Sequence, residues 1–66
     1  MIKTAWEVHV IDSQGMGNED YLITSGNASS AARRALKLAQ TEGKNRWIGV
    51  PIVSSINRLG YIHIYN

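Results

Sequence analysis

Hydrophobic and polar residues alternate near the start of the chain, at 4–11, and a second strand is expected at 19–25. Alternation with a period of two indicates strands that bury one face. The segment between them, 12–18, reads DSQGMGN and has the glycines and polar residues of a turn. We therefore expect an antiparallel hairpin with a long loop. In its first strand the expected inward side chains are Trp6, Val8 and Val10, and the outward ones are Glu7 and His9.

The period changes after Gly26, where small and apolar residues recur at helical spacing. Asn27 is a favourable N-cap residue, and Gly43 is placed to terminate the helix. The expected buried arc consists of Ala28, Ala31, Ala32, Ala35, Leu36, Leu38 and Ala39. A face lined by alanine predicts a helix that packs closely on a sheet and buries little area per residue.

The last third of the chain predicts a second hairpin. Pro51 cannot donate to a strand ladder, so 47–50 is expected to be an edge segment or an irregular lead-in. Strands are expected at 52–56 and 61–65, with a turn at the Asn-Arg-Leu-Gly sequence of 57–60. In the last strand we expect Ile62 and Ile64 to face the helix, and the other face to carry Tyr61, His63 and Tyr65.

Together these elements predict an α+β fold for residues 1–66. It is a four-stranded antiparallel sheet, in the order strand, strand, helix, strand, strand, with one amphipathic helix packed on one face. A chain of 66 residues makes one small domain. The hydrophobic content of 44% and the charged content of 18% favour a packed globular domain over disorder.

Composition also restricts the chemistry. The chain has no cysteine, which excludes disulfides and thiolate metal sites. No apolar run has the length of a membrane span, and the N-terminus lacks the apolar core of a signal peptide. We expect a cytoplasmic protein that does not contact membranes. His9 and His63 have no carboxylate or thiolate at ligand spacing, and no serine belongs to a recognisable nucleophile motif. No metal, cofactor or enzymatic activity is predicted.

The net charge of +2 conceals an uneven distribution. Residues 1–32 carry one lysine and four acidic residues (net −3), and residues 33–66 carry six basic residues and one acidic residue (net +5). Such polarity favours contact with an anionic partner, although an ordinary solvated helix face has the same appearance. The predicted contact set is Arg33, Arg34, Lys37, Lys44, Arg46 and Trp47.

A second predicted contact patch comprises the alternating residues Tyr61, His63 and Tyr65. Aromatic side chains on an open sheet face are able to stack on nucleic-acid bases. They also mark interfaces, so the same face is a candidate for contact with a second copy of the chain.

The overall pattern of the chain resembles small phage-encoded inhibitors of type I CRISPR surveillance complexes. The features that carry the resemblance are the short strand WEVHV, a return strand, the Ser/Ala-rich helix NASSAARRALKLA and a terminal hairpin. The resemblance implies a non-enzymatic anti-CRISPR protein that docks on the effector complex in the host cytoplasm and blocks DNA capture or nuclease recruitment. Several such inhibitors are acidic and imitate DNA, a mode that the positive charge of this chain excludes.

The leading functional prediction is therefore a phage-derived inhibitor that occludes a DNA- or partner-binding surface of a host protein complex. Two alternatives remain open from the residues alone. One is a nucleic-acid-binding or regulatory module that uses the basic helix face. The other is a homodimeric accessory protein that associates through its sheet face.

Overall fold

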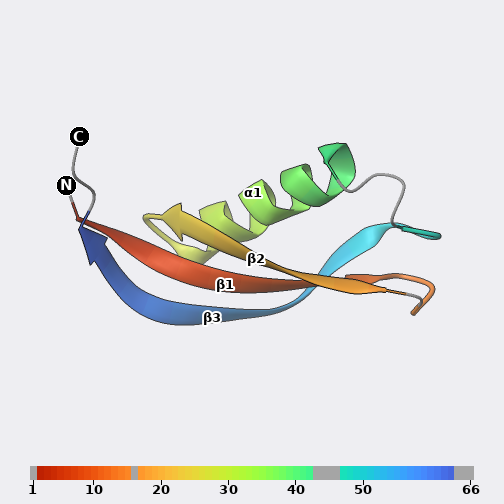
Figure 1. Cartoon of the computed structure of the whole chain (residues 1–66), viewed down its shortest axis with the longest axis horizontal. Helices are drawn as coiled ribbons and strands as arrows, with labels where there is room; N and C mark the ends of the chain where they lie inside the picture. Colours follow the sequence, from red (N-terminus) through yellow and green to blue (C-terminus); the bar gives the residue numbers. More distant parts are fainter. Residues whose placement is uncertain (1, 16, 43–46, 64–66) are drawn as a thin grey trace.

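A three-stranded antiparallel sheet with one helix on one of its faces forms the fold (Figure 1). The structure is a computed structural model, and it describes residues 2–15, 17–42 and 47–63. The sheet order is β2-β1-β3, so β1 lies in the centre. The elements are β1 (Ile2–Asp12), β2 (Asn18–Ser25), α1 (Ala28–Thr41) and β3 (Pro51–His63).

The first hairpin and the helix confirm the sequence prediction. β1 and β2 pair antiparallel, with Val8 opposite Tyr21. The side chain of Asn27 accepts a hydrogen bond of 2.8 Å from the backbone N–H of Ser30, as an N-cap residue does. The helix ends at Thr41, and the predicted terminator Gly43 lies outside the described residues. These elements depend on local patterns, which explains why the sequence was sufficient to locate them.

The predicted four-stranded sheet is wrong, because residues 57–60 do not form a turn. β3 is one strand of 13 residues that pairs along the whole of β1, which has 11 residues. The two extra residues are accommodated as bulges, at Ser54 and at Leu59, where the register shifts by one. Gly60, beside the second bulge, has φ = 132°, a backbone conformation that favours glycine.

Pairing with β1 explains why the chain continues instead of reversing. A continuous β3 has a partner residue for every position from Ile2 to Asp12. A reversal at 57–60 would leave much of that edge of β1 without backbone hydrogen-bond partners. The Asn-Arg-Leu-Gly sequence therefore supplies a bulged bend in a long strand.

The bulges also change which side chains face the helix. A one-residue shift moves every later side chain to the opposite face of a strand. Val53 and Ile56 pack against the core, and the residues that follow on this face are Arg58, opposite Trp6, and Tyr61, opposite Thr4. Successive residues of β3 on this face are therefore separated by three, two and three positions, whereas a regular strand has a constant separation of two. The prediction that Tyr61 faces away from the helix is therefore wrong.

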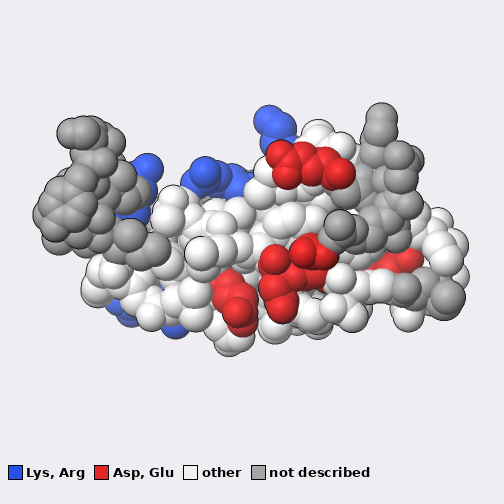
Figure 2. Space-filling view, viewed as in Figure 1, with Lys and Arg blue, Asp and Glu red and all other residues white. Residues whose placement is uncertain are grey.

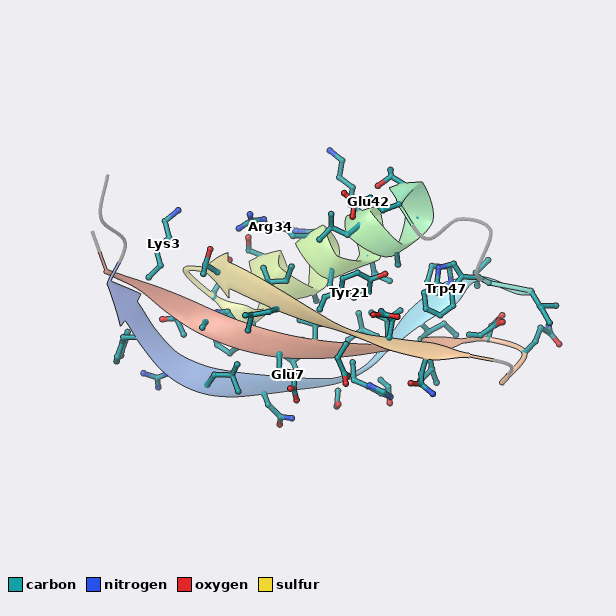
Figure 3. The ribbon with its side chains drawn as sticks, viewed as in Figure 1. Lys3, Glu7, Tyr21, Arg34, Glu42 and Trp47 are labelled. Carbon is teal, nitrogen blue, oxygen red and sulfur yellow. The ribbon has the colours of Figure 1, made fainter. Side chains whose placement is uncertain are left out.

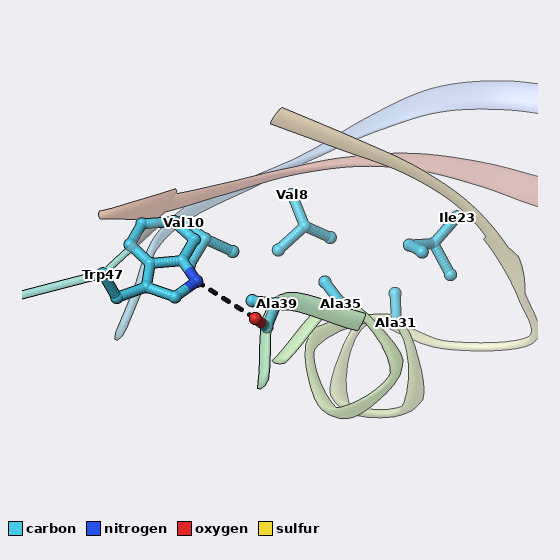
Figure 4. Packing of buried hydrophobic residues seen from close by; sticks show 7 residues of the cluster. All are labelled: Val8, Val10, Ile23, Ala31, Ala35, Ala39 and Trp47. Atoms are coloured by element: carbon cyan, nitrogen blue, oxygen red, sulfur yellow. Dashed lines mark hydrogen bonds between the residues drawn. The ribbon is translucent and has the colours of Figure 1, made fainter. Parts of the chain in front are cut away.

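The core lies between α1 and the sheet and is built largely from small side chains (Figure 4). Ala31, Ala35 and Ala39 are fully buried at successive helical turns, which brings the helix backbone close to the strands. Val8, Val10 and Ile23 cover the sheet side of this contact. The alanine-lined face predicted from the sequence is thus the buried face of α1.

Trp47 closes the core at the C-terminal end of α1. Its side chain is only 9% exposed, and its indole Nε1 donates a hydrogen bond of 3.0 Å to the carbonyl oxygen of Ala39 (Figure 4). The sequence predicts Trp47 as a partner contact, whereas the structure buries its side chain in the core. The small alanine face leaves space at the end of the helix that a large aromatic ring fills.

The segment that leads into β3 is held by the end of β1. The carboxylate of Asp12 accepts hydrogen bonds from the backbone N–H groups of Ile48 (2.8 Å) and Gly49 (2.9 Å). The hydroxyl of Ser13 accepts a third, from Val50 (2.9 Å). A Cβ atom at Gly49 would lie 2.0 Å from this hydroxyl oxygen, so the close approach requires glycine. We call this arrangement the Asp12 clasp.

Candidate anion-binding groove

Two hollows adjoin along the exposed side of α1. The first has a volume of about 460 Å³ and lies where the N-terminal part of α1 meets the ends of all three strands. The second, of about 280 Å³, continues along the helix. Arg34 lines both hollows, and we refer to them together as the basic groove. The side chains that matter below are Lys3, Thr4, Thr24, Ser30, Arg34 and Tyr61 in the first hollow, and Lys37 in the second.

Positive charge in the basic groove comes from two separate elements. Lys3 belongs to β1, whereas Arg34 and Lys37 belong to α1. Figure 3 shows Lys3 at the start of β1 and Arg34 on α1, and both residues line the first hollow. Figure 2 shows Lys and Arg side chains toward the left and the upper edge of the molecule, with acidic side chains toward the middle and right. Folding thus brings together cations that lie far apart in the sequence.

No lysine or arginine among the described residues forms an ion pair with a carboxylate. The ion pair found there joins His9 to Asp20, on the face of the sheet away from α1. Arg34 instead donates a hydrogen bond to the backbone carbonyl of Thr24, which directs its guanidinium toward the rim of the groove. A guanidinium has five N–H donors, so this bond leaves donors available to a ligand.

Tyr61 places an aromatic ring beside these cations. Its side chain is 70% exposed and lines the first hollow. The guanidinium carbon of Arg58 lies 4.7 Å from the centre of the ring, a cation–π contact that restrains the ring. The bulge at Leu59 makes this possible, because it turns Arg58 and Tyr61 to the same face of β3.

The structure brings together only part of the predicted contact set. Arg34, Lys37 and Tyr61 line the basic groove, whereas Arg33 is exposed on the same helix but lines neither hollow. Trp47 is buried. The remaining predicted contacts are outside the described residues or have side chains that are not described, namely Lys44, Arg46, His63 and Tyr65.

Sequence reasoning missed two residues of this region, Lys3 and Arg58. Lys3 is isolated in an otherwise acidic half of the chain, and nothing in its local pattern connects it with α1. Arg58 was assigned to a turn. Their positions follow from the pairing of β1 with β3, which places Lys3 opposite Ile62 in the same part of the sheet. Only a correct strand register could have identified them.

The opposite face of the sheet carries a row of polar residues. Asp20, His9 and Ser55 occupy directly paired positions on β2, β1 and β3, and His9 Nδ1 contacts Asp20 Oδ1. This order resembles that of an acid, a base and a nucleophile. However, Ser55 forms no hydrogen bond to His9 among the described residues, and the two hollows of the basic groove lie on the other side. We therefore do not assign a reaction to this row.

The two histidines occupy different positions along the paired strands β1 and β3. The first and last strands do pair, but His9 lies opposite Ser55, and His63 lies opposite Ile2 at the far end of β1. Within the part of the chain that the structure describes, no group of three His, Cys, Asp or Glu residues is placed to hold a metal ion. In the same part of the chain, no helix has the length and apolarity needed to cross a bilayer.

Comparison of the chain with protein-family models, with curated proteins and with solved structures finds no match. The functional conclusion must therefore be drawn from the basic groove. The groove contains cations, residues with hydroxyl groups and one exposed aromatic ring.

Proposed function

We propose that the protein is a small non-enzymatic binding protein that docks on an anionic partner through the basic groove. The observation that carries this proposal is the position of Lys3, Arg34 and Lys37 around adjoining hollows, where none of them forms an ion pair with a carboxylate of the described residues. Lysine and arginine side chains that serve only to keep a protein soluble can be spread over its surface and need not line the same hollow. Cations that line one present their charge to a ligand from several directions.

The resemblance to CRISPR inhibitors gives this proposal a biological setting. In that setting the protein acts in the cytoplasm of the infected cell, where the basic groove covers an acidic protein surface or a nucleic-acid backbone of the surveillance complex. Occlusion of such a surface requires no catalysis. The inhibitor function is tested by plating phage on a host with an active type I CRISPR system. Expression of the protein is expected to restore plaque formation, and a failure to restore it would contradict this function.

Charge reversal at Arg34 is expected to weaken binding to a polyanion far more than the same change at Arg33. Arg34→Glu removes a cation shared by both hollows and introduces repulsion, so we expect a loss of roughly 10-fold or more in affinity. Arg33→Glu changes the net charge equally on the same helix, but outside the groove. Its expected loss is about 3-fold or less in 0.15 M salt, because exposed charges beyond the Debye length of about 8 Å are largely screened.

The measurement is isothermal titration of each variant with a short inorganic polyphosphate at several salt concentrations. Arg34 also donates a hydrogen bond to Thr24, so thermal unfolding must show that Arg34→Glu remains folded. Lys37→Glu provides an independent variant of the second hollow, because the Lys37 side chain forms no ion pair with another described residue. Equal losses at Arg33, Arg34 and Lys37 would indicate a response to net charge only and would contradict a specific groove.

Association of two copies through the open sheet face stays a prediction. The face away from α1 has an exposed leucine, Leu22, but the bulge in β3 removes Tyr61 from it. A single monomeric mass by light scattering at micromolar concentration would contradict the dimer.

A further inference from the structure

We propose that the ligand of the basic groove is single-stranded nucleic acid, with one base stacked on Tyr61 and backbone phosphates held by Lys3 and Arg34. This inference rests on the proposed function, since it names the anionic partner that the same groove takes. It depends on an observation that the anion proposal does not need, namely the exposed aromatic ring beside the cations.

The ring of Tyr61 is arranged as a stacking platform. A ring that only packed into the fold would be buried, but Tyr61 is 70% exposed while lining a hollow. The guanidinium of Arg58 lies over it at 4.7 Å, so one face has a cationic neighbour and the other is available to a base. Stacking between an aromatic side chain and a base, reinforced by arginine, is the main contact of proteins that bind single strands.

The residues around the Tyr61 ring carry groups that can bind the phosphate and the sugar of a nucleotide. Lys3 and Arg34 line the same hollow as Tyr61 and supply donors for phosphate oxygens. Thr4 and Ser30, which carry hydroxyl groups, also line it, and a hydroxyl group is suited to sugar and base-edge oxygens and nitrogens. The volume of about 460 Å³ falls within the range of small-ligand sites. The hollow thus combines the three kinds of contact that one nucleotide requires.

A single strand fits this hollow better than a duplex. Bases in a duplex are stacked on each other and cannot lie on Tyr61 unless the strand is opened. In addition, the cations of the groove are few and lie along two adjoining hollows that share Arg34, whereas a duplex presents phosphates on both sides of a wide groove. An acidic peptide would satisfy the cations but would leave the aromatic ring without a role.

The test is fluorescence anisotropy with a labelled oligothymidylate and, separately, a labelled oligouridylate, each about 10 nucleotides long. Tyr61→Ala is expected to weaken binding by roughly 5- to 100-fold, the usual effect of removing one stacked base contact. Tyr61→Phe keeps the ring and is expected to bind within about 2-fold of the natural protein. Binding of both oligonucleotides indicates a strand without sugar selectivity, and binding of one identifies DNA or RNA.

Two further titrations separate this inference from the proposed function. A duplex of the same length is expected to bind at least about 10-fold more weakly, and polyphosphate binding is expected to be unchanged by Tyr61→Ala because polyphosphate has no bases. Oligonucleotide affinity that survives Tyr61→Ala, or equal affinity for the duplex, would overturn the nucleic-acid assignment. If polyphosphate binding still depends on Arg34 in that case, the proposed function stands and only the nucleic-acid assignment is overturned. If neither probe binds at low salt, both proposals are overturned.

Discussion

Replacement of Trp47 by alanine is expected to lower the free energy of unfolding by about 3–5 kcal/mol, as for other buried aromatic residues. Trp47 is the largest side chain of the buried core, most of whose other members are alanine and valine. Its removal leaves a cavity between β1 and the end of α1 and removes the hydrogen bond to Ala39. Because small domains have only about 5 kcal/mol or little more to lose, most of the fold's stability depends on this residue.

Urea unfolding followed by far-ultraviolet circular dichroism measures this loss. Ile48→Ala is a matched control, because Ile48 is the next residue in the chain but is 69% exposed, and its expected change is below about 0.5 kcal/mol. Trp47→Phe keeps most of the packing but loses the indole donor, so its loss in free energy of unfolding is expected to lie between those of Trp47→Ala and Ile48→Ala. If Trp47→Ala were as stable as Ile48→Ala, Trp47 would belong to the partner contact predicted from the sequence, and the description of the core would be wrong.

Removal of the Asp12 carboxylate is expected to release the segment that leads into β3. Asp12→Ala leaves the backbone N–H groups of Gln14, Ile48 and Gly49 without their acceptor. We expect the midpoint of thermal unfolding to fall by roughly 10–20 °C, since each lost acceptor is costly and a domain of this size has a small unfolding entropy. Ser13→Ala removes only one bond of the clasp and is expected to have a smaller effect. Equal melting midpoints for the natural protein and Asp12→Ala would contradict the clasp.

The Asp12 clasp also predicts an acid-dependent loss of stability. The hydrogen bond from Gln14, together with those from Ile48 and Gly49, holds the pKa of Asp12 below its ordinary value of 3.8, and outweighs the desolvation that raises it. A carboxyl group with a lowered pKa in the folded state stabilises that state fully above 3.8. This contribution disappears as the pH falls through the folded-state pKa, because the unfolded chain takes up the proton first.

Comparison with Asp12→Asn isolates this titration from that of the other carboxylates, which are present in both proteins. The difference in unfolding free energy between the two is expected to be constant from neutral pH to about pH 5 and to shrink below about pH 4. Denaturant unfolding at a series of pH values measures it. A difference that grew on acidification would mean that the pKa of Asp12 is raised, contrary to the hydrogen bonds that it accepts.

Only some residues of the basic groove could be predicted from the sequence. Arg34 and Lys37 were identified because they lie on the polar side of a helix whose period is visible in the chain. Tyr61 was identified as a contact residue, but on the wrong face, because alternation counted from Ile62 takes no account of a bulge. Lys3 was not identified, since its place beside Arg34 depends on how three strands pair.

The sequence by itself determined the elements whose signals are local. These signals are the alternation in β1, the cap at Asn27 and the alanine face of α1. Each lies within a few residues and reflects a preference that the chain has before it folds. Only the tertiary structure decided the course of β3, the burial of Trp47 and the face on which Tyr61 lies. The physical reason is that β1 offers a long unpaired edge and α1 leaves a space at its end, and both are satisfied by contacts between residues far apart in the chain.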